Sequence, residues 1–127
     1  MPGGDPFEYT VIRIVPRVER EEFINAGVIL YCRAHRYLDC RVRFNPGRLA
    51  CLARDADIGQ IEDELGLIAP ICRGGAGAGP LGEMEQAERF RWLAAPRSTT
   101  VQFSPVHGGM CEDPTAALDK LFEEMVE

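Results

Sequence analysis

Residues 25–44 have the sequence NAGVILYCRAHRYLDCRVRF, and this stretch decides the fold. Its first eight residues form an apolar run, which is typical of a strand buried on both faces. Its last eight residues alternate between apolar and polar side chains, with the two-residue period of a strand. If the RAHR segment between them is a turn, the two strands form an antiparallel hairpin in which Ile29 faces Cys40 and Cys32 faces Tyr37.

The patterns on either side of this hairpin predict two more strands and several helices. Residues 8–16 have apolar side chains on both faces, which favours a central strand, and residues 98–104 form a further strand with one polar face. Helices are expected over residues 48–53, over 58–72 with a kink or end at Pro70, over 83–94, and from Pro114 onward. Asp57 and Asp113 are the expected caps of the second and the last helix.

With the short helix at 48–53 left aside, the order of these elements is β-β-β-α-α-β-α, with hairpin-linked strands grouped ahead of the helices. This order predicts an α+β fold with an antiparallel or mixed four-stranded sheet and helices mainly on one face. We expect one domain over residues 1–127, with a loose N-terminus at 1–6 and a Gly-rich loop at 73–82.

The composition indicates a soluble protein that works in the cytoplasm. The 127 residues carry a net charge of −6, no apolar run is long enough to span a membrane, and the start lacks the features of a secretory signal. Five cysteines, with no Cys-x-x-Cys spacing, are typical of reduced thiols. The negative charge argues against nucleic-acid binding.

The polar face of the strand at residues 98–104 is the first place to look for a site. Val101 and Phe103 are expected to point inward, and Ser98, Thr100, Gln102 and Ser104 outward. Such a row of short hydrogen-bonding side chains is either a hydrated surface or the wall of a binding site.

Several charged side chains are candidates for a shared site near this strand. Arg13, Arg17 and Arg97 with Glu21 are expected either to converge on an anion such as phosphate or to form a salt-bridge network that pins the first strand. The candidate binding residues are Arg13, Arg17, Glu21, Asn25, Arg97, Ser98, Gln102 and His107.

His107 is the candidate for acid–base catalysis, because only histidine normally titrates near neutral pH. Glu112 or Asp113 would orient its ring. The alternative is a structural loop histidine whose ring bonds main-chain carbonyls.

No cofactor or metal site is expected. The segment Gly77-Ala78-Gly79-Pro80-Leu81-Gly82 fits the G-x-G-x-x-G pattern of dinucleotide-binding proteins, but a helix precedes it where that motif needs a strand. Cys32, His35, His107 and Cys111 have spacings that zinc permits, yet core thiols and surface histidines are the favoured interpretation. Whether the chain is an enzyme stays open at this point.

Several longer stretches together resemble a bacterial family. They are YTVIRIVPR from Tyr9, EEFINAGVIL from Glu21, RFRWLAAPRST from Arg89, Gln102 with the SPVH run that follows it, and the Asp113-Pro114 pair. The combination is similar to the short bacterial proteins grouped as domain of unknown function 3037. The resemblance implies no particular reaction. It does imply that the protein binds or regulates a partner, because members of the family accompany a kinase of the toxin–antitoxin type.

Two hypotheses about function follow. The first is a non-enzymatic module that binds and regulates a protein partner, such as a toxin-type kinase. The second is a small enzyme or an anion- or nucleotide-binding protein that uses the polar strand face and His107. The second hypothesis requires Arg13, Arg97, Gln102 and His107 to line one pocket.

Overall fold

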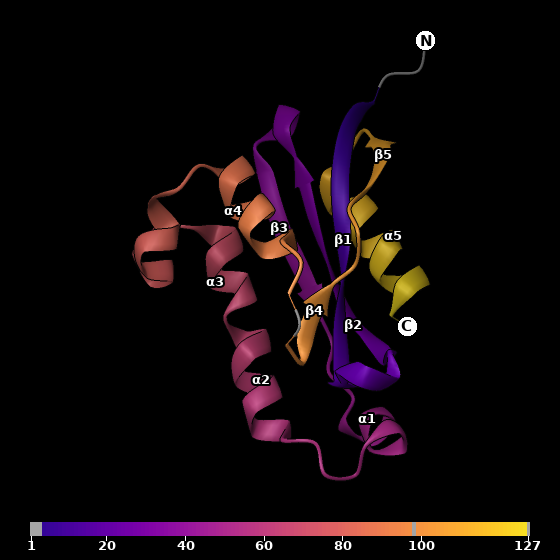
Figure 1. Ribbon diagram of the computed structural model, residues 1–127. Helices are drawn as coiled ribbons and strands as arrows, with labels where there is room; N and C mark the ends of the chain where they lie inside the picture. The colour runs from indigo at the N-terminus through magenta and orange to yellow at the C-terminus, as the bar shows by residue number, and fades with distance from the viewer. Residues whose placement is uncertain (1–3, 98, 127) are drawn as a thin grey trace.

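The computed structural model of the chain describes residues 4–97 and 99–126. Its centre is an antiparallel sheet with the strand order β3-β2-β1-β4, in which β5 also pairs with β1 (Figure 1). The strands are β1 (Asp5–Arg17), β2 (Glu22–Cys32), β3 (Tyr37–Val42), β4 (Val101–Phe103) and β5 (His107–Cys111). The predicted α+β class is confirmed, and β5 is a fifth strand that the sequence patterns did not predict.

The hairpin of residues 25–44 forms with the predicted register. Ile29 pairs with Cys40, and Cys32 pairs with Tyr37. The turn is the short 3₁₀-helix η2 (Arg33–His35). Arg36 closes this turn in the left-handed region with a φ of 51°. The turn therefore places two of the hairpin's arginines, Arg33 and Arg36, at one end of the sheet.

The outer edge of β1 is shared by two short strands, with β5 on its first half and β4 on its second half. Ser104 lies between β4 and β5, where its hydroxyl accepts a hydrogen bond from the Val11 amide at 2.8 Å. The Thr10 hydroxyl donates to the Ser104 carbonyl at 2.7 Å. Ser104 is only 2% exposed, so the prediction that it points outward is wrong. Its hydroxyl is buried because it satisfies a main-chain amide where the edge changes strand.

Two helices begin at the caps that the sequence predicts. The Asp57 side chain accepts from the Gln60 amide at 3.1 Å, and Asp113 accepts from the Thr115 amide at 3.0 Å. These contacts satisfy main-chain donors that have no partner within the helix. The helices are α1 (Pro46–Leu52), α2 (Ile58–Gly66), α3 (Ile68–Arg73), α4 (Gln86–Ala94) and α5 (Pro114–Met125), with η1 (Val18–Arg20) and η3 (Ala76–Glu83) as further 3₁₀-helices.

The break expected at Pro70 lies three residues earlier, at Leu67, between α2 and α3. Pro70 itself occupies the first turn of α3, where a missing amide hydrogen costs no helical bond. The predicted single helix is therefore two consecutive helices.

The sheet has a hydrophobic core on each face. α2, α3 and α4 cover one face, and α5 packs on part of the other (Figure 1). Ile12, Ile29 and Phe90 are fully buried in the first core, and Leu30 and Leu118 in the second. The prediction that the helices lie mainly on one face is confirmed. Among the described residues, no helix combines the length and apolar character needed to cross a membrane.

Two segments expected to be irregular contain regular structure. β1 begins at Asp5, so the expected loose N-terminus overlaps the sheet, and residues 1–3 lie outside the described part of the chain. The Gly-rich segment 73–82 contains most of η3, and the Gly75 amide donates to the Gly82 carbonyl at 3.1 Å.

Candidate functional site

Three of the candidate residues form a row across three neighbouring strands. Arg13 on β1 pairs with Asn25 on β2 and with Gln102 on β4. Directly opposed residues of antiparallel strands point to the same face of the sheet. This is the face that carries α5, because the Asn25 amide group donates to the carbonyl of Met125 at 2.9 Å.

Arg13 lacks a carboxylate partner within the described residues. Its guanidinium carbon lies 4.2 Å from the centre of the Phe23 ring, which is a cation–π contact. Its Nε atom is buried without a hydrogen-bond partner, and the same is true of the Oδ1 atom of Asn25. A buried donor and a buried acceptor without partners, side by side, are suited to a group supplied from outside the chain.

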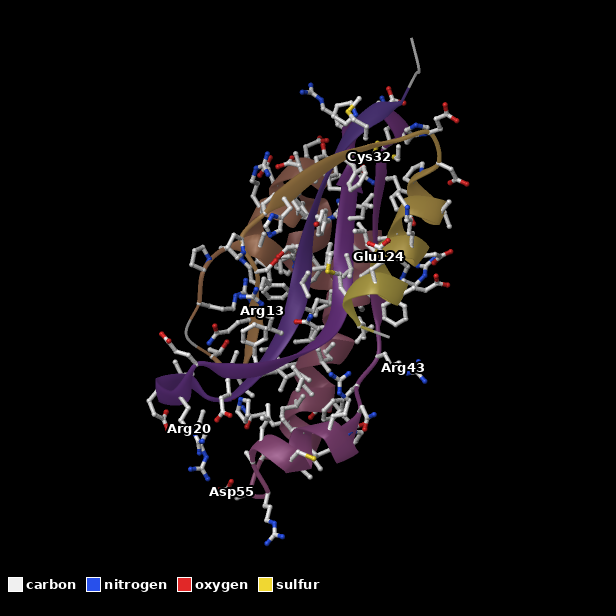
Figure 2. All side chains as sticks on the ribbon, turned by 90° about the vertical axis from the view of Figure 1, so that its right-hand side faces the viewer. Arg13, Arg20, Cys32, Arg43, Asp55 and Glu124 are labelled. Atoms are coloured by element: carbon white, nitrogen blue, oxygen red, sulfur yellow. The ribbon has the colours of Figure 1, made fainter. Side chains whose placement is uncertain are left out.

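α5 covers only part of this face. The helix packs on β2 and β3, and Arg13 lies to the side of it on β1 (Figure 2). We call the part of the face beside α5 the open half-face, and define it by Tyr9, Arg13, Phe23, Gln102 and His107. Of these residues, Tyr9 is half-buried and also packs against the core beneath α5. Phe23 is 43% exposed although it is a large apolar side chain.

Arg97 lies on the other face of the sheet. Its guanidinium donates to the carbonyl of Trp92 at 2.8 Å and to that of Leu93 at 3.1 Å, near the C-terminal end of α4. It also lies 4.9 Å from the ring centre of Phe103, which follows Gln102 in β4 and therefore points the opposite way. Burial lowers the pKa of the Arg97 guanidinium. A site that needs Arg13 and Arg97 together is not assembled in the structure.

The other charged candidates do not gather around Arg13 either. Arg17 lies 3.5 Å from Asp55 in an exposed ion pair. Glu21 ends η1 in the left-handed region with a φ of 56°. The predicted network of Arg13, Arg17, Arg97 and Glu21 is therefore absent from the described residues, and Ser98 lies outside them.

His107 stands on the same face as Arg13 but farther along the sheet. It pairs with Tyr9, and the two rings lie 5.4 Å apart. Tyr9 and Arg13 are four residues apart on β1, roughly 13 Å at the usual rise of a strand. Asp113, one of the two expected orienting carboxylates, caps α5 instead. The acid–base role of His107 stays a prediction.

The thiols form two close pairs, one on each face. A hydrogen bond with Cys40, together with burial, raises the pKa of Cys72. Burial and the nearby Cys32 raise the pKa of Cys111 to about 11. The Nε2 atom of His35 bonds the Asp5 carboxylate at 2.9 Å. In the residues that the structure describes, no group of three or more His, Cys, Asp or Glu side chains is suited to hold a metal ion.

A family model matches residues 9–126, which is nearly the whole chain. The chain belongs to the family Protein of unknown function (DUF3037). This membership confirms the resemblance seen in the sequence. No curated protein and no solved structure matches the chain. The DUF3037 description assigns no reaction to the family.

Phe23 is the residue of this DUF3037 protein that the sequence reasoning missed. It precedes Asn25 by two positions on β2, so both side chains point to the same face. When Arg13 pairs with Asn25, this spacing puts Phe23 beside the guanidinium. The two-residue spacing of Phe23 and Asn25 is visible in the sequence, but it points to Arg13 only when the register between the first two strands is known.

Proposed function

We propose that this DUF3037 chain is a non-enzymatic protein-binding or regulatory module of the bacterial cytoplasm, which binds its partner through the open half-face. The observation that carries the proposal is Arg13, whose buried Nε lacks a hydrogen bond beside the unpaired Oδ1 of Asn25. Arginine and aromatic side chains dominate the binding energy of many protein interfaces.

The chemistry of the surface defines the partner. Arg13 offers a guanidinium without a carboxylate partner among the described residues, and Phe23 supplies an aromatic ring beside it, while Tyr9 lies farther along the same face next to His107. The matching partner presents a carboxylate next to an apolar side chain, because the carboxylate accepts from arginine with charge assistance. A kinase of the toxin–antitoxin type, which the family resemblance implies, is the first partner to test.

The test is the affinity of the full chain for that kinase, measured by biolayer interferometry. We expect Arg13→Gln combined with Phe23→Ser to weaken binding by at least about tenfold, which is ~1.4 kcal/mol. Leu67→Ser is the matched control, because Leu67 is 63% exposed and lies between α2 and α3. Binding that is absent in the wild type, or that the control weakens as much, would contradict the proposal.

The alternative is an anion- or nucleotide-binding protein that uses the polar strand and His107. The four-residue pocket that it required is not formed, because Arg97 lies on the other face of the sheet, so its remaining support is the unpaired atoms of Arg13 and Asn25. A thermal-shift screen with nucleotides separates the two functions. Stabilisation by a nucleotide that His107→Ala abolishes would favour the alternative, whereas an unchanged response would remove the histidine from it.

A further inference from the structure

A second site lies on the opposite face of the sheet, at the hairpin end. A groove of about 1160 Å³ runs between the start of β1, the η2 turn and the start of α4. Its charged lining consists of Arg33, Arg36, Arg89, Arg91, Glu8 and Glu85. The balance of this lining is positive, although the chain as a whole has a net charge of −6.

Most of the positive charge in the groove is unpaired. Arg91 is held by Glu8 through two contacts, at 3.0 and 3.3 Å. Arg33 and Arg36 are exposed on the η2 turn, and the described residues offer neither of them an ion-pair partner. Two exposed guanidinium groups are therefore available to a ligand on one wall.

Arg89 supplies a buried charge on the other wall. It is only 7% exposed, and its guanidinium donates to the carbonyl of Met84 at 2.6 Å and to that of Cys72 at 3.3 Å. Its Nε is buried without a hydrogen bond, and no carboxylate within the described residues pairs with it. Burying a guanidinium without a counter-ion is costly, so an anion in the groove would offset that cost.

The beginning of α4 adds main-chain donors to the same wall. The first helical residues, Gln86 and Ala87, line the groove, and no side chain caps this end of the nine-residue helix. The Gln86 side chain donates to the Arg36 carbonyl at 2.9 Å, which ties the two walls together. Free amides at a helix start favour phosphate, as does the positive end of the helix dipole.

We propose that this groove binds a small ligand with two or more phosphate groups. Forked guanidinium groups and helix amides both match the several oxygens of a phosphate. Recognition would rest on the phosphates, because Tyr31, an aromatic residue of the lining, is buried and stacked on Phe90. This site is independent of the open half-face and of the partner proposed for it.

The test is isothermal titration of the full chain with inorganic tripolyphosphate. We expect Arg33→Gln combined with Arg36→Gln to weaken binding by at least about tenfold, which is ~1.4 kcal/mol. Both residues are exposed, so the variant should fold normally. The matched control, Arg20→Gln with Arg54→Gln, removes the same charge at the other end of the sheet, where Arg20 lies far from Cys32 (Figure 2). It should change binding by no more than about twofold, because exposed charges that far away are screened.

Two further measurements decide the chemistry. Glu85→Gln removes an exposed carboxylate from the groove and should strengthen binding by about twofold to fivefold, because it removes like-charge repulsion. Citrate, a polycarboxylate, should bind more weakly than tripolyphosphate. The proposal is overturned if the wild type does not bind tripolyphosphate at millimolar concentration, if the control pair weakens binding as much as the groove pair, or if citrate binds as tightly.

Discussion

Arg13 and Arg89 both have a buried Nε atom without a hydrogen-bond partner, but they lie on opposite faces of the sheet. Arg13 rests on the ring of Phe23 on the open half-face. Arg89 donates to two carbonyls, one at the end of α3 and one just before α4. Arg89 is therefore bonded to the main chain of two segments, whereas Arg13 contacts a single aromatic ring.

This difference indicates that the two arginines have different roles, although each has a buried Nε atom without a hydrogen bond. Arg89 connects Cys72 to Met84 and so holds η3 between α3 and α4, which makes it a structural residue as well as part of the groove. Arg13 connects no separate segments through its side chain. Its loss should therefore change what the protein binds more than how stably it folds.

The largest effect is expected for Arg89→Met. The substitution leaves two carbonyls without their charged donor, and such bonds are worth roughly 1.5–3 kcal/mol each. Relief of the buried charge offsets part of this loss. We expect the free energy of unfolding to fall by about 3 kcal/mol in urea denaturation. Arg13→Met is the matched variant and should change it by less than about 1 kcal/mol, since a single cation–π contact is lost. If the two substitutions lowered the free energy of unfolding equally, Arg89 would not be more important for stability than Arg13.

Gly74→Ala, a substitution beside Arg89, should lower the free energy of unfolding by a smaller amount. Gly74 has a φ of +75°, and an added Cβ would lie 2.9 Å from Cζ of Arg89. A side chain in this backbone region costs of order 1–3 kcal/mol, so we expect a loss of about 2 kcal/mol. Gly77→Ala is the control, because nothing lies within 4 Å of its added Cβ. If the clash with Arg89 matters, Gly74→Ala should cost less when Arg89 is already methionine.

Sequence patterns predicted the parts of this fold that local signals determine. The alternation in the hairpin gave the pairing of Ile29 with Cys40, and the cap residues Asp57 and Asp113 marked the starts of two helices. In these places the residues that set the structure are close in sequence, so their spacing is sufficient.

The strand β5 could not be predicted in this way. Its sequence, His-Gly-Gly-Met-Cys, has neither the alternation nor the β-branched residues of a strand. It is a strand because the first half of β1 has a free edge to pair with. Gly109 fits there because a Cβ would come within 2.5 Å of the Phe7 ring.

The candidate site was predicted only in part, because it too depends on contacts between segments that are distant in sequence. Arg13, Asn25 and Gln102 were all among the candidates, and the structure brings them into one row across three strands. Arg97 was placed with them wrongly, because it lies on the other face of the sheet, where it donates to the carbonyls of Trp92 and Leu93 at the end of α4. The groove arginines come from the hairpin and from α4, and only the packing of these distant elements brings them together.

The smallest effect should come from the thiols, which also differ between the two faces. On the α5 face, burial and Cys32 raise the pKa of Cys111 from 9.0 to about 11. Between these values the unfolded chain has lost the thiol proton and the folded chain retains it, so stability falls as the pH rises from about 9 to about 11. Denaturation across this range should show a modest decline that Cys111→Ser reduces. Cys51→Ser removes an exposed thiol on α1 and should keep the wild-type profile. If Cys111→Ser shows the same decline as the wild type, the decline comes from other groups, such as the pair formed by Cys40 of β3 and Cys72 of α3.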